Sequence, residues 1–180
     1  MSYTSLLFHC VFATKERRPL ISDELQTRLW AYMGGIARLN GFIALEVGGM
    51  PDHVHLLISL PPTMPVAKAM QLIKAGSSLW MHESAARPRF QWQEKYGAFS
   101  IGISQKDATA RYIRNQKKHH ARVNFRDEWK ASMKRHGFPV EEHLPALACR
   151  AIVTRPFGAT QRTLLSRPWH AGLPSPAPPG

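Results

Sequence analysis

Apolar residues fall into short runs with two different spacings along the first hundred residues. Runs rich in β-branched and aromatic residues predict strands over residues 3–14, 42–47, 52–60 and 90–102. Apolar residues at helical spacing predict helices over residues 22–39 and 66–81. Gly48-Gly49 predicts the turn between the second and third strands. This βαββαβ order predicts an α+β, ferredoxin-like fold: an antiparallel sheet with two helices on one face.

The third predicted strand carries two histidines, His53 and His55. Successive side chains of a strand lie on opposite faces, so both imidazoles lie on one face and Val54 and Leu56 on the other. Neutral imidazole is a common ligand of divalent ions. The pair is therefore either half of a metal site or two hydrogen-bonded histidines on a partly buried strand. Asp52 beside it fits a turn position or a partner that orients an imidazole.

A further long helix is predicted over residues 104–120. It places Tyr112 and Gln116 on one face, because residues four apart meet on the surface of a helix. The two histidines at its end, His119 and His120, are expected on the surface, where their charged forms would stabilise the helix C-terminus. We therefore leave them out of the predicted site.

The stretch from Gln105 to His136 is the most basic part of the chain. It holds ten Lys and Arg residues against three acidic residues. A solvated helical face accounts for part of this charge, but the excess favours contact with an anionic partner. Residues 125–136 also predict a short helix, whose apolar stripe of Phe125, Trp129 and Met133 is expected to pack against the domain.

The composition of the whole chain favours the same kind of partner. Its 180 residues include 24 Lys and Arg against 12 Asp and Glu, a net charge of +12, which suits nucleic acid or a membrane surface. No apolar run reaches the roughly 20 residues that cross a bilayer, and the N-terminus lacks the basic region of a secretory signal. We therefore expect a cytoplasmic protein with no membrane partner.

Two cysteines, Cys10 and Cys149, are too few for a disulfide framework, and we expect both to be reduced. His9, within the first strand, is expected to be packed or hydrogen-bonded rather than a ligand, and Cys10 is expected to be a packing residue. Residues 1–137 form the predicted domain. Residues 138–180 are rich in proline and arginine and are expected to be a disordered basic extension, because such a composition cannot bury a core.

Four motifs, taken in order, resemble those of the single-tyrosine HUH transposases of the insertion-sequence-two-hundred type and their relatives associated with repetitive palindromic elements. They occupy residues 8–18 (FHCVFATKERR), 50–57 (MPDHVHLL), 74–78 (KAGSS) and 112–116 (YIRNQ). The resemblance implies a homodimeric enzyme that recognises a DNA hairpin and cleaves and joins single-stranded DNA.

The resemblance also assigns residues to these roles. It implies that Tyr112, on the C-terminal helix, is the nucleophile and that His53, His55 and Gln116 bind a divalent metal. It implies DNA contacts by the basic residues at the exit of the first strand and on the helix faces: Lys15, Arg17, Arg18, Lys74, Arg111, Arg114, Lys117 and Lys118.

The chemistry of these residue types is consistent with those roles. A metal at His53 and His55 would polarise a phosphodiester, and Tyr112 would attack it to give a 5′-phosphotyrosine and a free 3′-OH. A phenol with its ordinary pKa of about 10 needs activation by the metal or by cations such as Arg111 and Lys117. A second 3′-OH can reverse the step and join a new strand. Mg²⁺ or Mn²⁺ is expected, and imidazole and amide ligands favour Mn²⁺. A structural zinc site is not expected, because the pattern offers no closed set of four ligands.

Other functions fit part of the pattern. A domesticated protein that binds a DNA or RNA hairpin without strand transfer would need the basic surface but not all of Tyr112, His53, His55 and Gln116. A replication initiator or relaxase would share the cleavage step, but usually carries a helicase domain or a third metal-binding histidine. A hydrolase of small phosphoesters would release its product. A covalent DNA adduct separates the transposase from the hairpin-binding protein and from the hydrolase.

Overall fold

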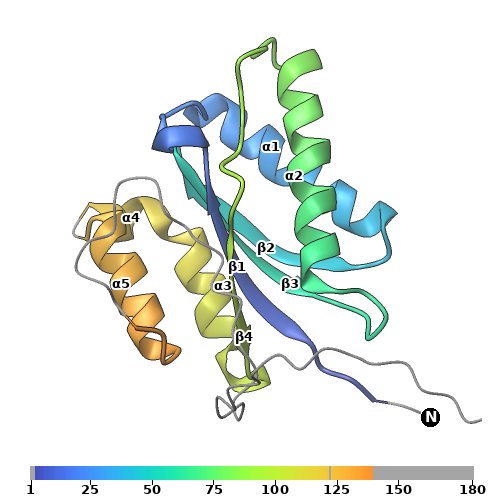
Figure 1. Ribbon diagram of the computed structural model, residues 1–180, viewed down its shortest axis with the longest axis vertical. Helices are drawn as coiled ribbons and strands as arrows, with labels where there is room; N and C mark the ends of the chain where they lie inside the picture. The colour runs from blue at the N-terminus through green and yellow to red at the C-terminus, as the bar shows by residue number, and fades with distance from the viewer. Residues whose placement is uncertain (1–2, 122, 140–180) are drawn as a thin grey trace, which may run out of the picture.

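The protein is described by a computed structural model over residues 3–121 and 123–139 (Figure 1). The predicted order of strands and helices is confirmed. It runs through β1 (Leu7–Ala13), α1 (Asp23–Leu39), β2 (Ile43–Met50), β3 (His53–Ser59), α2 (Val66–Glu83) and β4 (Gly97–Ile101). Three further helices follow: α3 (Lys106–Arg114), α4 (Gln116–His120) and α5 (Phe125–Arg135). Two 3-10 turns, η1 (Lys15–Arg17) and η2 (Ile103–Gln105), follow β1 and β4. The predicted disordered extension lies almost wholly outside the described residues.

The four strands form one antiparallel sheet in the order β2-β3-β1-β4. This is the predicted ferredoxin-like arrangement, with β1 and β3 paired at its centre. Val11 of β1 lies opposite His55 of β3, and His9 lies opposite Leu57. The register therefore brings the first-strand histidine to the same region as the His-x-His pair.

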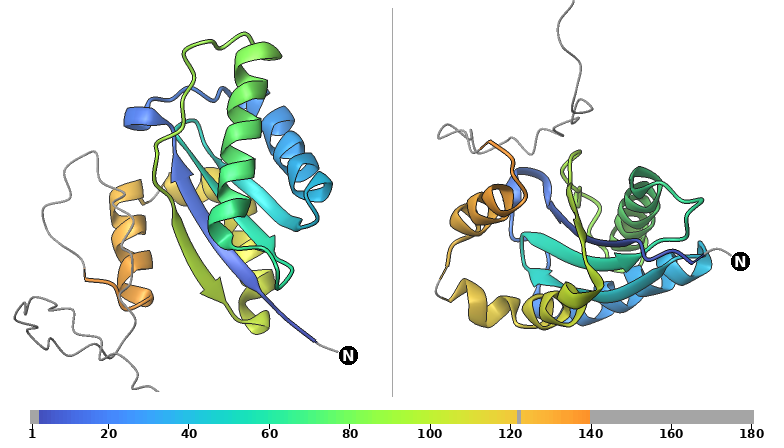
Figure 2. Two further views of the ribbon diagram at one scale, coloured as in Figure 1. Left: turned by 45° about the vertical axis from the view of Figure 1, so that its right-hand side comes forward. Right: turned by 90° about the horizontal axis from the view of Figure 1, so that it is seen from below.

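One face of the sheet is packed against α1 and α2, which lie side by side (Figure 2). Apolar residues of β1 and β3 that point to this face, such as Phe12, Val54 and Leu56, are fully buried in the main core. A smaller apolar cluster of Leu57, Ala110 and Ile113 attaches α3 to the opposite face. Each strand thus supplies one face to the core and one to α3, α4 and α5, as the period of two requires.

The predicted glycine turn was wrong. Gly48 and Gly49 lie inside β2, and the chain turns at Pro51-Asp52 instead. The two glycines are needed for close approach rather than for a turn, because a Cβ atom at Gly48 would lie 2.6 Å from the carbonyl oxygen of Ile113. The bare backbone of β2 allows α3 to lie directly on the sheet.

The predicted helix over residues 104–120 is also interrupted. Asn115 has φ −97° and ψ 19°, and its side-chain amide donates to the carbonyl of Arg111, so α3 ends at Arg114. Helix α4 then begins at Gln116. The last strand is shorter than predicted, because residues 90–96 form an irregular segment that pairs with the sheet only at Trp92 and Thr14. No helix among the described residues is long and apolar enough to cross a membrane.

Candidate active site

The polar face of the sheet carries three histidines, His9, His53 and His55, beneath α3, α4 and α5. His53 and His55 point to the same face, as predicted, and their exposed fractions are 1% and 2%. The run of apolar residues on the other face of β3 explains their burial, since it fixes the strand at the centre of the fold. Buried imidazoles need partners for both ring nitrogens, and the contacts of these nitrogens define the site.

His53 is held by the carboxylate of Asp52. Its Nδ1 lies 2.7 Å from Asp52 Oδ1, and the other oxygen of the carboxylate accepts from the guanidinium of Arg17. Burial alone would raise the pKa of Asp52, but the hydrogen bond and charge of His53, with Arg17, hold that pKa below its usual value. The carboxylate fixes the proton of His53 on Nδ1. The other nitrogen, Nε2, is buried and has no hydrogen-bond partner.

His55 is held by a second histidine. Its Nδ1 lies 3.0 Å from Nε2 of His9, and the ring centroids are 5.2 Å apart. Burial, followed by the positive charge that His9 and His53 would carry, lowers the pKa of His55 well below its usual value, so its imidazole is neutral at pH 7. Burial likewise lowers the pKa of His9 to about 4. Nε2 of His55 is buried and accepts or donates no hydrogen bond.

Two residues from the C-terminal helices complete a cluster of possible metal ligands. One ligand atom from each of His53, His55, His120 and Glu128 can be chosen so that all four lie within 4.8 Å of one another. Nε2 of His120 lies 2.9 Å from one oxygen of Glu128, and Nε2 of His55 lies 3.4 Å from the other, without hydrogen-bond geometry. Burial raises the pKa of Glu128 to about 7 and lowers that of His120 to about 4.

Gln116 lies in the same cluster. It is 1% exposed at the start of α4, and its Nε2 is 3.5 Å from an oxygen of Glu128. Its Oε1 is buried without a hydrogen-bond partner, as are Nε2 of His53 and of His55. The structure therefore brings together all three residues that were predicted to bind a metal.

These atoms fit a divalent ion. Buried polar atoms without partners are costly, and a metal would satisfy several of them at once. Imidazole nitrogens with carboxylate and amide oxygens suit a borderline ion such as Mn²⁺ or Zn²⁺. No set of four ligands was found in the sequence, but the structure places ligand atoms of His120 and Glu128 beside those of the two predicted histidines.

Sequence reasoning missed His120 and Glu128. His120 was expected on the surface, but its side chain is 9% exposed. Glu128 was counted only as one of three acids in a basic segment. The available signal was helical spacing: Glu128 is three residues after Phe125, so both share the side of α5 that packs. The centroids of the Phe125 and His53 rings are 4.7 Å apart. The guanidinium carbon of Arg17 lies over the Phe125 ring, 3.6 Å from its centroid. These contacts hold Glu128 over the sheet.

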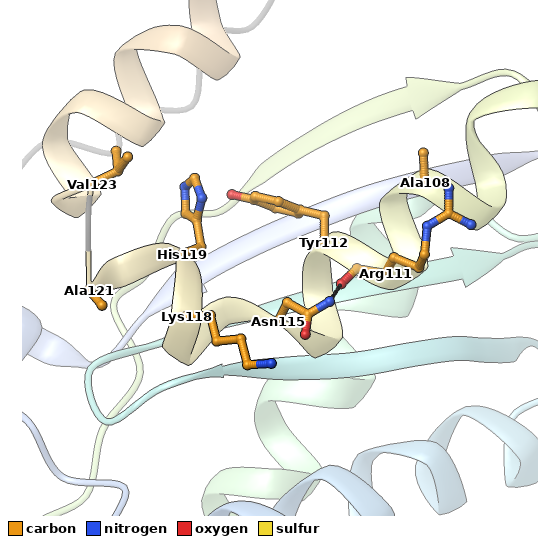
Figure 3. Close-up of a pocket in the computed structure, with 8 residues that line it drawn as sticks. All are labelled: Ala108, Arg111, Tyr112, Asn115, Lys118, His119, Ala121 and Val123. Carbon is orange, nitrogen blue, oxygen red and sulfur yellow. Dashed lines mark hydrogen bonds between the residues drawn. The ribbon is translucent and has the colours of Figure 1, made fainter.

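Tyr112 lies beside this cluster. Its ring meets His55, His9 and His119 edge to face, with centroids 5.7, 6.0 and 5.2 Å away. Figure 3 shows its hydroxyl directed toward the imidazole of His119, and Nε2 of His119 is another buried nitrogen without a partner. Tyr112 also lines a surface groove of about 750 Å³, together with Arg111, Asn115, Lys118 and others. Tyr112 therefore lies between this groove and the buried cluster, with its ring 5.7 Å from that of His55.

The predicted DNA-binding residues divide into two sets. Arg111 and Lys118 line the groove of Tyr112 and form no ion pair within residues 3–121 and 123–139. The others have intramolecular partners. Arg17 pairs with Asp52, Arg18 with Glu16, Arg114 with Glu46 and Lys117 with Asp23, while Lys15 donates to the side chain of Gln91. Lys74 donates to the carbonyl oxygens of Gln93 and Glu94, so its ammonium fixes the segment before β4.

A ferredoxin-like sheet with a buried His-x-His pair, and a tyrosine on the helix that follows the last strand, define the class of single-tyrosine HUH proteins. Residues 2–116 match the family model for IS200-like transposases, and this chain belongs to that family. The chain is 28% identical over 88 residues to the transposase of insertion sequence element IS200 from Salmonella typhimurium, a match that covers 49% of this chain and 58% of the relative. The chain thus spans little more than half the length of that curated relative.

Other relatives are matched over more of their length. The ISDra2 transposase TnpA of Deinococcus radiodurans is 25% identical over 119 residues, 62% of this chain and 84% of the relative. A crystal structure of a Deinococcus radiodurans R1 protein assigned as a transposase superposes with a TM-score of 0.52 at 26% identity, over 64% of this chain and 93% of the other. A REP-associated tyrosine transposase bound to a REP hairpin shares the fold, with a TM-score of 0.50 at 16% identity over 91% and 97% of the two chains.

Proposed function

We propose that this protein is a metal-dependent transposase that cleaves and rejoins single-stranded DNA through a covalent bond between Tyr112 and a 5′-phosphate. The observation that carries the proposal is the position of Tyr112, whose ring lies 5.7 Å from that of His55, beside a cluster of buried donor atoms without partners. Family membership supports the same reaction. Because a REP-associated relative with this fold binds a REP hairpin, we propose a DNA hairpin as the recognition element.

The proposed metal ligands are His53, His55 and Gln116, with His120 and Glu128 in reach of the same ion. When bound, Mg²⁺ or Mn²⁺ would draw electrons from the phosphate and favour attack at phosphorus. The three imidazoles favour Mn²⁺, since Mg²⁺ prefers oxygen ligands.

The chain itself supplies the nucleophile and the positive charge around it. The phenol oxygen of Tyr112 would form a bond to phosphorus, lose its proton, and displace the 3′-oxygen, which leaves as a 3′-OH. Arg111 and Lys118 would neutralise the phosphate in the groove, because no acidic side chain among the described residues is paired with them. The new bond between Tyr112 and phosphorus is a phosphoester bond, like the bond to the 3′-oxygen that it replaces. A second 3′-OH can therefore displace Tyr112 and join a new strand.

The assembly that carries out this reaction stays a prediction. The resemblance to the family implies a homodimer, which sedimentation of the hairpin complex would measure. Tyr112 and the cluster lie in the same chain, so we propose that one chain holds a full set of reacting groups.

The test is the formation of a covalent adduct. Single-stranded DNA with a hairpin, labelled at its 3′ end, would be incubated with the protein and Mn²⁺ and resolved on a denaturing gel. We expect a protein-linked band with the 3′ label and a released fragment with a free 3′-OH. Tyr112→Phe and a chelator should each abolish both. Tyr32→Phe is the matched control, because Tyr32 lies on α1, stacked on Trp80.

A second candidate function is hairpin binding without strand transfer. The observation that favours it is the number of residues in the cluster, because four side-chain ligands are typical of a structural zinc site. Tight hairpin binding with no adduct in Mg²⁺ or Mn²⁺, and with no effect of Tyr112→Phe, would decide for this second function.

A further inference from the structure

We propose that His9 is a positioning residue: its Nε2 accepts the hydrogen bond from Nδ1–H of His55 and so keeps the lone pair of His55 Nε2 directed into the metal cluster. The proposal rests on the metal-binding role of His55 in the proposed function. It assigns to the first strand a part in the site that its sequence did not indicate, since His9 was expected only to be packed or hydrogen-bonded.

The strand register brings the two imidazoles together. His55 lies directly opposite Val11, so His9, two residues earlier on the same face of β1, is its diagonal neighbour. The ring planes are inclined by only 19°, and Nε2 of His9 lies 3.0 Å from Nδ1 of His55. The His9 ring also has Phe99 on one side and Tyr112 on another, with centroids 6.4 and 6.0 Å away. These neighbours restrict the ring to this orientation.

The direction of the hydrogen bond follows from the other nitrogen of His55. A neutral imidazole carries one proton, on Nδ1 or on Nε2. If His9 were the donor, the proton of His55 would be on Nε2, which is buried and has no acceptor with hydrogen-bond geometry. If His55 is the donor, its proton is satisfied by His9 and its Nε2 is a bare lone pair. The second arrangement satisfies both nitrogens of His55 once a metal binds. The first leaves Nε2–H without an acceptor and blocks that nitrogen from a metal.

The neighbouring ligand shows the same construction. His53 has its Nδ1 fixed by the carboxylate of Asp52 at 2.7 Å, and its Nε2 also faces the cluster without a partner. An orienting acceptor behind each metal-binding histidine is a common arrangement, and its loss typically weakens metal binding. By this comparison His9 has the role for His55 that Asp52 has for His53.

The first measurement uses the metal-free wild-type protein. Long-range ¹⁵N–¹H correlation spectra of ¹⁵N-histidine-labelled protein report which ring nitrogen carries the proton, and the His55 signals are those missing from His55→Gln. We expect the proton of His55 on Nδ1. A proton on Nε2 would overturn the proposal without any variant of His9, because His9 would then be the donor.

The second measurement is the Mn²⁺ affinity, followed by electron paramagnetic resonance without DNA. His9→Leu removes the acceptor and should weaken binding by about tenfold or more. His9→Gln can place a carbonyl oxygen near the position of Nε2, and should restore most of the affinity. Val11→Ala is the matched control, because Val11 lies on the same face of β1 but has no polar atom.

Equal Mn²⁺ affinity of His9→Leu and wild type would overturn the proposal, as would a loss in Val11→Ala as large as that in His9→Leu. Neither outcome depends on the DNA reaction. An absent adduct in the wild-type protein, with the expected Mn²⁺ affinities and the proton of His55 on Nδ1, would instead contradict the proposed transposase chemistry and leave the role of His9 intact.

Discussion

The two faces of the central sheet differ in what their buried groups require. On the face toward α1 and α2, Phe12, Val54 and Leu56 are apolar, and packing satisfies them completely. On the other face, His53 and His55 are equally buried, but each retains a nitrogen without a partner. Because the side chains of β3 alternate between the two faces, this one strand supplies both the buried apolar residues and the buried histidines. The difference shows how a fold can carry costly buried polar atoms: the apolar face supplies the stability that the polar face reduces.

The largest predicted effect comes from the removal of a histidine from the polar face. His53→Leu replaces an imidazole by an apolar side chain of similar size and deletes one proposed ligand. We expect the Mn²⁺ affinity to fall by more than the roughly 100-fold that the loss of an orienting partner can cost, and the DNA adduct to disappear. The free energy of unfolding without metal should change by about 1 kcal/mol or less, because removal of the buried Nε2 without a partner offsets the hydrogen bond from Nδ1 to Asp52, whose carboxylate keeps Arg17 as a partner. Titration with Mn²⁺ and urea denaturation measure the two effects.

The matched control lies on the opposite face of the same strand. Leu56→Ala leaves a cavity in the main core and should lower the free energy of unfolding by about 2–5 kcal/mol, while the Mn²⁺ affinity of the folded protein stays that of wild type. If His53→Leu destabilises the protein as much as Leu56→Ala does, the polar face belongs to the stabilising core and the contrast between the faces is wrong.

The polar face should also make stability depend on pH. Burial lowers the pKa of His9 and of His120 to about 4 and holds that of His55 well below its usual value, so between pH 6.5 and about 4 these histidines take up protons on unfolding. Because the unfolded chain binds more protons in this range, these histidines lower the free energy of unfolding as the pH falls from 6.5 towards 4. Glu128 acts in the opposite direction, because its pKa of about 7 means that the folded protein holds a proton between pH 4.5 and 7 that the unfolded chain does not.

Three histidines outweigh one carboxyl group, so the metal-free protein should lose stability between pH 6.5 and 4. Glu128→Gln isolates the opposing contribution. At pH 8 the buried carboxylate of the wild type is charged, and removal of that charge should raise the free energy of unfolding by up to about 3 kcal/mol. At pH 4.5 the two proteins should be equally stable. Urea denaturation at both pH values checks this, and an equal difference at the two values would show that Glu128 does not titrate as described.

Much of the fold could be predicted from local pattern. Alternation on β3 placed His53 and His55 on one face, and helical periodicity gave α1 and α2 nearly to the residue. The metal cluster could be predicted only in part, because His120 and Glu128 reach it through the folding of α4 and α5 back over the sheet. Their positions depend on tertiary contacts, such as Phe125 against His53, which no spacing along the chain determines.

The glycines of β2 show the same limit. Gly48-Gly49 was interpreted as a turn because glycine is frequent in turns, but the turn is made by Pro51-Asp52. The actual requirement at Gly48 is the approach of α3, which is fixed by a partner 65 positions later, Ile113. The local sequence indicates that a glycine is needed at this position, but only the packed structure shows whether it serves a turn or a close contact.

A single added methyl group at Gly48 tests that requirement. In Gly48→Ala the new Cβ atom would lie 2.6 Å from the Ile113 carbonyl oxygen, so α3 must move away from β2. We expect a loss of about 1–3 kcal/mol of stability from overpacking and slower formation of the DNA adduct, because Tyr112 moves with α3. Urea denaturation and the rate of adduct formation by the folded protein measure the two consequences.

Gly35→Ala is the control for Gly48→Ala, because Gly35 lies in α1 with no atom within 4 Å of the new Cβ. It should raise stability by up to about 1 kcal/mol through helix propensity and leave the adduct rate unchanged. A Gly48→Ala protein with the wild-type adduct rate would mean that Tyr112 reaches the phosphate without α3 lying against β2. The polar face would then set the positions of the metal ligands but not that of the nucleophile.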